Sequence, residues 1–162
     1  MKIKSSIEDP EQKFGYMSVK YRSSEDEEIY GLGLQYTQWN FKGKEVHMIS
    51  SEGGVGRGLQ PVTFIANNFM GGQGGNPTTS YTASYTHLTN KNRAFLFNTT
   101  ALGYVDFTKK SESKVVFWHE KSVELHLIYG QSPKALAGSL SKTIGTMQPL
   151  PDWIMNGAII SL

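Results

Sequence analysis

The chain has 162 residues, 38% of them hydrophobic, which is enough to bury the core of about one domain and argues against disorder. Its formal net charge is +2, with 16 lysines and arginines scattered along the chain, so the charge balance does not favour nucleic acid or an acidic membrane surface as a partner. No cysteine is present, which excludes disulfides, thiolate metal ligands and thiol nucleophiles. No run approaches the roughly 18 apolar residues that cross a membrane.

Most of the sequence has the composition of β-structure. Segments rich in aromatic and β-branched residues, separated by polar turns, predict strands at residues 14–21, 62–66, 80–88, 94–97, 103–107, 115–119 and 123–129. In the last of these, Val123 and Leu125 alternate with Glu124 and His126, so the final two strands are predicted to form a hairpin with one solvent-exposed face. Many short strands with regular turns predict an all-β fold, an antiparallel β-sandwich.

One segment has the period of a helix instead. Ser132 can accept a hydrogen bond as an N-cap, and Pro133 occupies the first helical position, where its missing N–H does no harm. Apolar residues then recur every four positions until Gly145, which is typical of a helix end. A linking helix of about three turns is therefore expected.

The C-terminal segment, residues 150–162, reads LPDWIMNGAIISL. An apolar run without alternation predicts a strand buried on both faces, as in a parallel sheet, which needs neighbouring strands and covering helices. We therefore expect the chain to be the front part of a longer protein. The expected division is a sandwich portion at residues 1–131, a linking helix and turn at 132–149, and the start of a second domain at 150–162. The polar N-terminus shows no signal peptide, but if the chain begins inside a longer protein the compartment stays open.

The titratable residues do not form a recognisable catalytic or metal motif. The acidic cluster at residues 25–28 lies in a polar turn, where solvent is expected to keep all four carboxylates ionised. The four histidines lack metal-ligand spacing, and each is expected to be a strand surface residue. These are His47, His87, His119 and His126. The sequence predicts no bound metal and no cofactor.

Two linked stretches, residues 30–44 and 51–61, carry the side chains best suited to ligand binding. The second contains four glycines within six residues, which allow the main chain to approach a ligand closely. Glu52 and Arg57 lie in that loop and have the polar groups that recognise sugar hydroxyls, while Trp39 offers an apolar face for a sugar ring. The alternative is a structural turn in which Glu52 and Arg57 pair with each other.

Three stretches in this order, GLGLQYTQWNFKGK, SEGGVGRGLQP and LPDWIMNGAIISL, resemble glycoside hydrolase family 31, the α-glucosidase family. The form Ser-Glu-x-Gly-Val-Gly-Arg is similar to the branch that includes the sulfoquinovosidases. The resemblance covers about residues 12–162. It implies a galactose-mutarotase-like sandwich followed by the first strand of a (β/α)₈ barrel, and an α-glycoside substrate that is hydrolysed with retention.

The resemblance also implies which parts are missing from this chain. The aspartate nucleophile and the aspartate acid/base of the family lie on later barrel strands, so no residue here is expected to be catalytic and the missing barrel is the expected partner. A sandwich loop helps to shape the substrate pocket, which makes Glu52, Arg57 and Gln35 the candidate substrate-binding residues. Leu34 occupies the position where the family usually has glutamate.

Two other functions remain open from the sequence. A free-standing, non-catalytic carbohydrate-binding sandwich would account for the aromatic residues and the glycine-rich loop, but not for the apolar C-terminal segment. A mutarotase-like epimerase would need its own acid and base, for which His119, Glu124 and His126 are the available groups. Nothing in their spacing supports that assignment.

Overall fold

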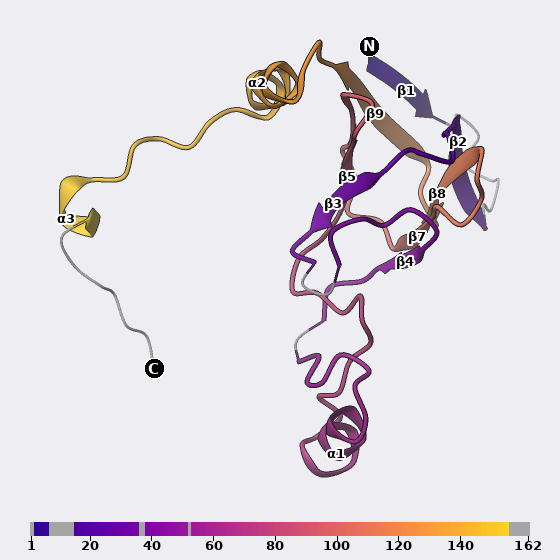
Figure 1. The fold of residues 1–162 in the computed structure, drawn as a ribbon, viewed down its shortest axis with the longest axis vertical. Coiled ribbons are helices and arrows are strands. Elements are labelled where there is room, and N and C mark those ends of the chain that lie inside the picture. The colour runs from indigo at the N-terminus through magenta and orange to yellow at the C-terminus, as the bar shows by residue number, and fades with distance from the viewer. Residues whose placement is uncertain (1, 7–14, 36–37, 52, 156–162) are drawn as a thin grey trace.

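The computed structural model describes residues 2–6, 15–35, 38–51 and 53–155. In this part of the chain two antiparallel sheets pack face to face as a sandwich (Figure 1). The strands are β1 (Lys2–Ser6), β2 (Tyr16–Arg22), β3 (Ile29–Gly33), β4 (Glu45–Met48), β5 (Ala83–Thr89), β6 (Arg93–Phe97), β7 (Gly103–Asp106), β8 (Glu112–Trp118) and β9 (Ser122–Tyr129). One sheet has the order β1-β9-β6-β5-β3 and the other β2-β8-β7-β4. The predicted all-β sandwich is confirmed.

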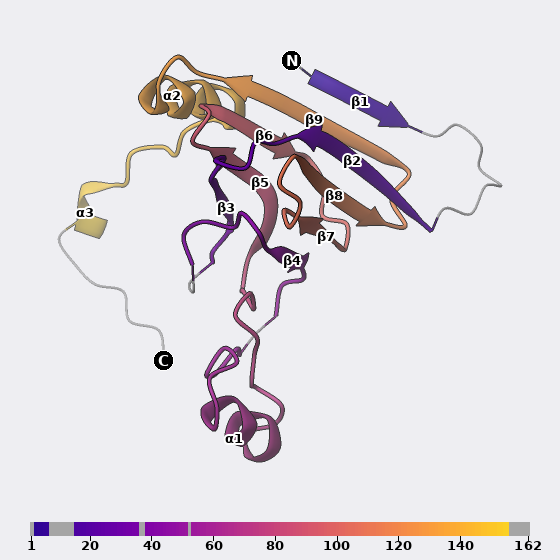
Figure 2. The same ribbon diagram turned by 45° about the vertical axis from the view of Figure 1, so that its right-hand side comes forward.

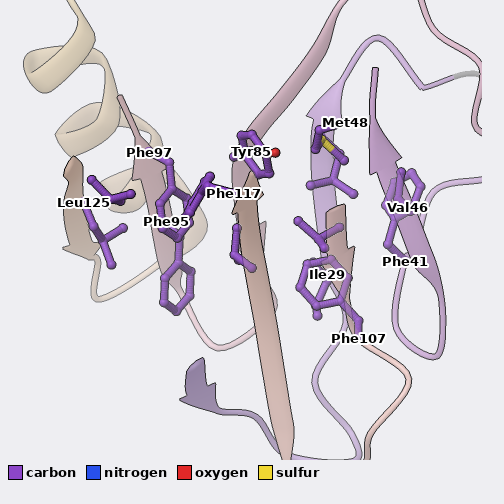
Figure 3. Packing of buried hydrophobic residues seen from close by; sticks show 14 residues of the cluster. Ile29, Phe41, Val46, Met48, Tyr85, Phe95, Phe97, Phe107, Phe117 and Leu125 are labelled. Atoms are coloured by element: carbon purple, nitrogen blue, oxygen red, sulfur yellow. The ribbon is translucent and has the colours of Figure 1, made fainter. Parts of the chain in front are cut away.

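The core lies between the two sheets and is rich in aromatic rings (Figure 3). Phe97 on β6 and Phe117 on β8 come from different sheets, and their ring centroids are 5.5 Å apart. Tyr85 on β5 lies 4.8 Å from the ring of Phe117. Full burial of each such ring contributes on the order of 1.5–3 kcal/mol, so this contact holds the two sheets together.

The strand predicted at residues 62–66 is wrong, because this segment forms the helix α1 (Val62–Phe69). Its inward side carries the small residues Thr63 and Ala66. The Thr63 hydroxyl accepts a hydrogen bond from Gly58 N at 2.8 Å and donates one to Val55 O at 3.3 Å. The β-branched composition favours a strand, but these tertiary contacts override that preference.

The predicted hairpin of the last two strands is also wrong. β8 pairs with β2 and β7, whereas β9 pairs with β1 and β6, so the chain crosses from one sheet to the other between Trp118 and Ser122. His119, at this corner, has a φ of 56°. The prediction that Val123 and Leu125 share one face of their strand is confirmed, since both are buried. Alternation identifies the inward face of a strand but not the sheet it joins.

The linking helix is confirmed as α2 (Pro133–Ile144). Ser132 Oγ accepts a hydrogen bond from Ala135 N at 3.2 Å, and Gly145 is the C-cap. The helix packs against β9 and β6, with Leu136 buried. Ile144, at the other end of the expected apolar stripe, is exposed in this structure.

The segment after α2 runs away from the sandwich (Figure 1). Its described part contains the one-turn helix α3 (Asp152–Met155), with Ile154 N donating to Pro151 O at 3.0 Å, so residues 152–155 are not extended as the strand prediction required. A proline at the start and an acidic residue in the first turn both favour a helix over a strand. Residues 156–162, the rest of the predicted strand, lie outside the described residues. No helix in the described part of the chain is long and apolar enough to cross a membrane.

Between β4 and β5 the chain projects from the sandwich as an arm, residues 49–82, with α1 near its tip (Figure 1 and Figure 2). All of the arm except residue 52 is described. Its two limbs are joined by the parallel bridges Ser50–Ser80 and Val55–Gly74, and Ser51 N donates to Ser80 O at 2.9 Å. The arm therefore contains the whole glycine-rich loop and holds it away from the sheets.

Two glycines with open space around them make a matched stability test. We expect Gly138→Ala, inside α2, to raise the free energy of unfolding by about 0.5–1 kcal/mol, because a Cβ there meets nothing within 4 Å and alanine favours helix. Gly43→Ala should instead lower it by about 1 kcal/mol, since its surroundings are equally open but its φ is +80°. Urea denaturation of both variants measures the difference. A gain for Gly43→Ala would contradict the assigned turn.

Candidate functional site

The glycine-rich loop of the arm is closely packed against its neighbours. A Cβ on Gly56 would lie 2.6 Å from Thr63 Oγ1, and one on Gly53 would lie 2.9 Å from Gln73 O. Both glycines also have positive φ values, of 75° and 90°. Glycine is therefore required here for packing within the arm as well as for backbone conformation. The loop is a pre-formed turn that can hold a side chain in a fixed place.

Arg57 is the charged residue that this loop positions. Its φ is 44°, and it is half-buried. Its Nη1 atom donates a hydrogen bond to the carbonyl oxygen of Thr79, on the returning limb of the arm. The guanidinium is thus fixed against the arm. Glu52 lies outside the described residues, so both its binding role and its pairing with Arg57 remain predictions.

Gln35 lies just beyond β3, beside a groove of about 380 Å³. Its Nε2 atom donates to Leu32 O at 3.3 Å, and its Oε1 atom is buried without a hydrogen-bond partner among the described residues. The groove is lined mostly by apolar and aromatic groups, with a second amide. Its lining residues are Tyr30, Gly31, Gly33, Gln35, Gln38, Trp39, Phe41 and Leu88.

The aromatic side of this groove is open to solvent. Trp39 is 80% exposed, and its ring centroid lies 5.7 Å from that of Tyr30. A concave, mainly apolar site with a few amide groups suits a small uncharged ring. An exposed indole can stack on the C–H face of a sugar, while amides bond to hydroxyls. The sequence predicted this use for Trp39, and the structure places the ring where a ligand can reach it.

The two linked stretches meet at the base of the arm. Ser80 Oγ donates to Leu34 O at 2.7 Å, and Leu34 N donates to Thr82 O at 3.0 Å. The stretch that contains Gln35 is thus bonded to the limb that carries Thr79, the partner of Arg57. Sequence spacing alone could not show this, because residues 34 and 80 are far apart in the chain.

The acidic turn at residues 25–28 was predicted to be fully solvated, but one of its four carboxylates is buried. Glu27 is 1% exposed, and Arg93 binds it through Nε–Oε1 at 2.7 Å and Nη2–Oε2 at 2.6 Å. Burial acts to raise the pKa of Glu27, but the hydrogen bonds and charge of Arg93 outweigh it and the net pKa is lowered. Asp26, in contrast, is exposed and pairs with Lys91. One of the four carboxylates is therefore structural and buried, because only its position faces Arg93 on β6.

The prediction that His87 is a surface residue is wrong, because this side chain is completely buried. Its Nδ1 lies 2.8 Å from Tyr85 O and its Nε2 lies 2.7 Å from the Tyr21 hydroxyl. Burial lowers the pKa of His87 to about 4, so the ring is neutral, donating from Nδ1 and accepting at Nε2. Its position two residues after Tyr85 on one strand was the signal that it faces inward. In the part of the chain that the structure covers, no three acidic or histidine residues gather as a metal site.

Comparison with known proteins gives sequence and fold relatives, although no family model matches the chain. It is 28% identical over 137 residues to a sulfoquinovosidase of Agrobacterium fabrum, covering 85% of this chain and 20% of that protein. It is 23% identical over 145 residues to a sulfoquinovosidase of Escherichia coli, covering 89% of this chain and 21% of that protein. A solved GH31 family sulfoquinovosidase from E. rectale, in complex with the aza-sugar inhibitor IFGSQ, has a TM-score of 0.83 at 22% identity and covers 98% of this chain and 24% of that one. The chain thus spans about one fifth of the length of the curated relatives it matches.

Proposed function

We propose that this chain forms part of an α-glycosidase of glycoside hydrolase family 31, in which it shapes the substrate pocket while a barrel domain performs the chemistry. The observation that carries this proposal is the sequence similarity to two sulfoquinovosidases over most of the chain. The proposed substrate class is an α-glycoside whose sugar carries a sulfonate, and the proposed outcome is hydrolysis with retention.

The carboxylates of the chain support a non-catalytic role. A retaining glycosidase needs two carboxyl groups about 5–5.5 Å apart on either side of the scissile bond. Partly buried carboxylates among the described residues are engaged elsewhere: Asp106 accepts from Thr108 N and Oγ1 at 2.9 and 2.6 Å, and Glu124 lies 2.9 Å from His126 Nε2. Glu112 pairs with Lys109, and Glu120 accepts from Thr99 Oγ1 at 3.0 Å. Glu27 is paired with Arg93. We therefore propose that nucleophile and acid/base both come from the barrel.

The arm is the part that we propose to line the pocket. A guanidinium carries five N–H donors in a rigid fork that matches an anionic oxygen group such as a sulfonate. Thr79 O fixes the orientation of Arg57, which reduces the entropy that would be lost on binding. The aromatic groove near Gln35 and Trp39 would accommodate the uncharged part of a glycoside.

The decisive experiment compares this chain with the product of the reading frame that contains it. We expect the DNA after the Leu162 codon to continue through two widely separated aspartates on barrel strands, and the complete product to release aglycone from an aryl α-sulfoquinovoside. The 162-residue chain alone should release none. Turnover by the short chain that disappears when one of its own carboxylates is replaced would overturn the proposal.

Arg57 gives a finer test in the complete enzyme. We expect Arg57→Ala to lower kcat/KM for an aryl α-sulfoquinovoside about ten- to hundredfold, the loss of a hydrogen bond to a charged group worth roughly 1.5–3 kcal/mol. The matched control is Arg22→Ala, which removes an exposed arginine on β2 of the four-stranded sheet and should leave kcat/KM unchanged. Thermal denaturation separates the alternative in which Arg57 only braces the arm: a lower Tm with unchanged kcat/KM would retire it as a substrate residue.

A non-catalytic carbohydrate-binding module is the second candidate, and the exposed Trp39 ring in its groove favours it. In that case the 162-residue chain should bind α-glucosides, with a change in tryptophan fluorescence that Trp39→Ala removes. A complete reading frame with no hydrolase activity and intact binding would support this function over the first.

A further inference from the structure

The outer face of the four-stranded sheet carries a row of aromatic rings for which the proposed pocket gives no role. Tyr16, Trp118, Tyr104 and His47 come from β2, β8, β7 and β4, so the row crosses the whole sheet. Tyr16 is the register partner of Trp118, and His47 is that of Tyr104. Their neighbours along each strand face the core, so alternation directs these four side chains away from it.

The rings of His47, Tyr104 and Trp118 are close enough to act as one surface, and Tyr16 extends it on β2 as the register partner of Trp118. Ring centroids lie 6.0 Å apart for His47 and Tyr104, 6.2 Å for Tyr104 and Trp118, and 6.4 Å for His47 and Trp118. The planes are inclined by 44–54°, which makes the row uneven instead of flat. Val116, on β8 between Lys114 and Trp118 and opposite Tyr104 in the register, is 2% exposed although alternation directs it outward.

Lys114 places a positive charge within this row. Its Nζ lies 5.6 Å from the Tyr16 ring centroid, 5.8 Å from that of Tyr104, and 3.5 Å from the Tyr104 hydroxyl. Among the described residues no carboxylate lies within 4 Å of this Nζ, and Asp106, its register partner on β7, accepts bonds from Thr108. The charge of Lys114 acts on Asp106, but the two side chains form no salt bridge, so the ammonium lies against the aromatic faces with N–H donors that no carboxylate among the described residues binds. These donors can bond to an anionic group.

We propose that this face, Tyr16, His47, Tyr104, Lys114 and Trp118, is a second carbohydrate-binding site for a sugar that bears an acidic substituent. The apolar face of the sugar ring stacks on the aromatic row, and the acidic group bonds to Lys114. The choice of a sulfonated hexose rests on the proposed function, whereas the site itself rests on the rings and the lysine.

Most of this face lies away from the proposed pocket, and only its His47 end borders the arm, where His47 lines a cavity with Ser51 and Thr79. α2 packs on β9 and β6 of the five-stranded sheet, whereas the aromatic row faces outward from the other sheet. The arm, with α1 near its tip, projects away from the sheets (Figure 1). A sugar held here would therefore keep the protein near sulfonated glycans without occupying the pocket.

The test measures binding of methyl α-sulfoquinovoside to the 162-residue chain by titration calorimetry, with methyl α-glucoside as the uncharged comparison. Lys114→Met should raise the Kd for the sulfonated sugar about tenfold or more and leave the Kd for the glucoside unchanged. Trp118→Leu should weaken both sugars. Tyr129→Ala, an exposed ring on β9 of the other sheet, is the matched control and should change neither.

Two results would overturn this site. One is an unchanged Kd for the sulfonated sugar in Lys114→Met at an unaltered Tm. If Trp118→Leu fails to fold, Lys114→Met and the milder Trp118→Phe provide the test. The other is loss of binding in Arg57→Ala, which would assign the sugar to the arm. Neither result bears on hydrolysis by the complete enzyme, so failure of this site and failure of the proposed function are distinguishable.

Discussion

Arg93→Ala is expected to lower the free energy of unfolding by about 3–5 kcal/mol, because it leaves the buried carboxylate of Glu27 without its counter-charge. The side chains of the pair are 18% and 1% exposed, and two hydrogen bonds join them. The guanidinium also lies 5.4 Å from the Tyr21 ring centroid and 5.3 Å from that of Phe95. Urea denaturation at neutral pH measures the loss.

The neighbouring pair of Asp26 and Lys91 provides the control, since its side chains are 72% and 42% exposed. Lys91→Ala should cost less than about 1 kcal/mol, as expected of a solvated ion pair. Replacing both partners, as in Glu27→Leu with Arg93→Met, should recover much of the loss because no uncompensated charge stays buried. An Arg93→Ala cost as small as that of Lys91→Ala would show that Glu27 reaches solvent.

His87 should make the protein sensitive to mild acid. Its pKa in the folded chain is depressed from 6.5 to about 4, mainly by burial, so the unfolded chain binds a proton first as the pH falls. Stability is therefore lost between about pH 6.5 and pH 4, by about 3 kcal/mol in total, and this contribution levels off below pH 4. Glu27 adds a loss in the same direction, which begins as the pH approaches the unfolded value of 4.5 and continues at more acidic pH, since its pKa in the folded chain is lowered.

Unfolding free energies measured from pH 7 to pH 4 test this expectation. His87→Gln keeps an acceptor for the Tyr21 hydroxyl but cannot titrate, so its curve should be flatter over this window whatever its absolute stability. A slope that survives His87→Gln would assign the acid sensitivity to another group.

The features that the sequence predicts well depend on neighbours along the chain. The N-cap of Ser132 and the inward pair Val123 and Leu125 follow from local spacing, and both are as expected. The helix α1 departs from its β-branched composition because Thr63 bonds to Val55 and Gly58, contacts that form only within the arm.

The errors at Glu27 and His87 have a different physical origin, because each is decided by a residue distant in sequence. Glu27 is buried only because Arg93 arrives on β6, 66 residues later, and His87 is satisfied by Tyr21, 66 residues earlier. The candidate site divides in the same way. Composition identified the Arg57 loop and Trp39, but the bond from Ser80 to Leu34 that brings the two stretches together is a long-range contact.

The arm leaves the sandwich after Met48 and returns at Ala83, and the bridge between Ser50 and Ser80 holds its two ends together. Closing a loop costs only about 0.6 kcal/mol more for each doubling of its length. Because that bridge and the sheets fix the entry and exit points, arms of very different length and sequence can be exchanged on one sandwich at nearly constant stability. Under the proposed role of the arm as a wall of the pocket, ligand preference can then diverge quickly while the β-framework stays the same.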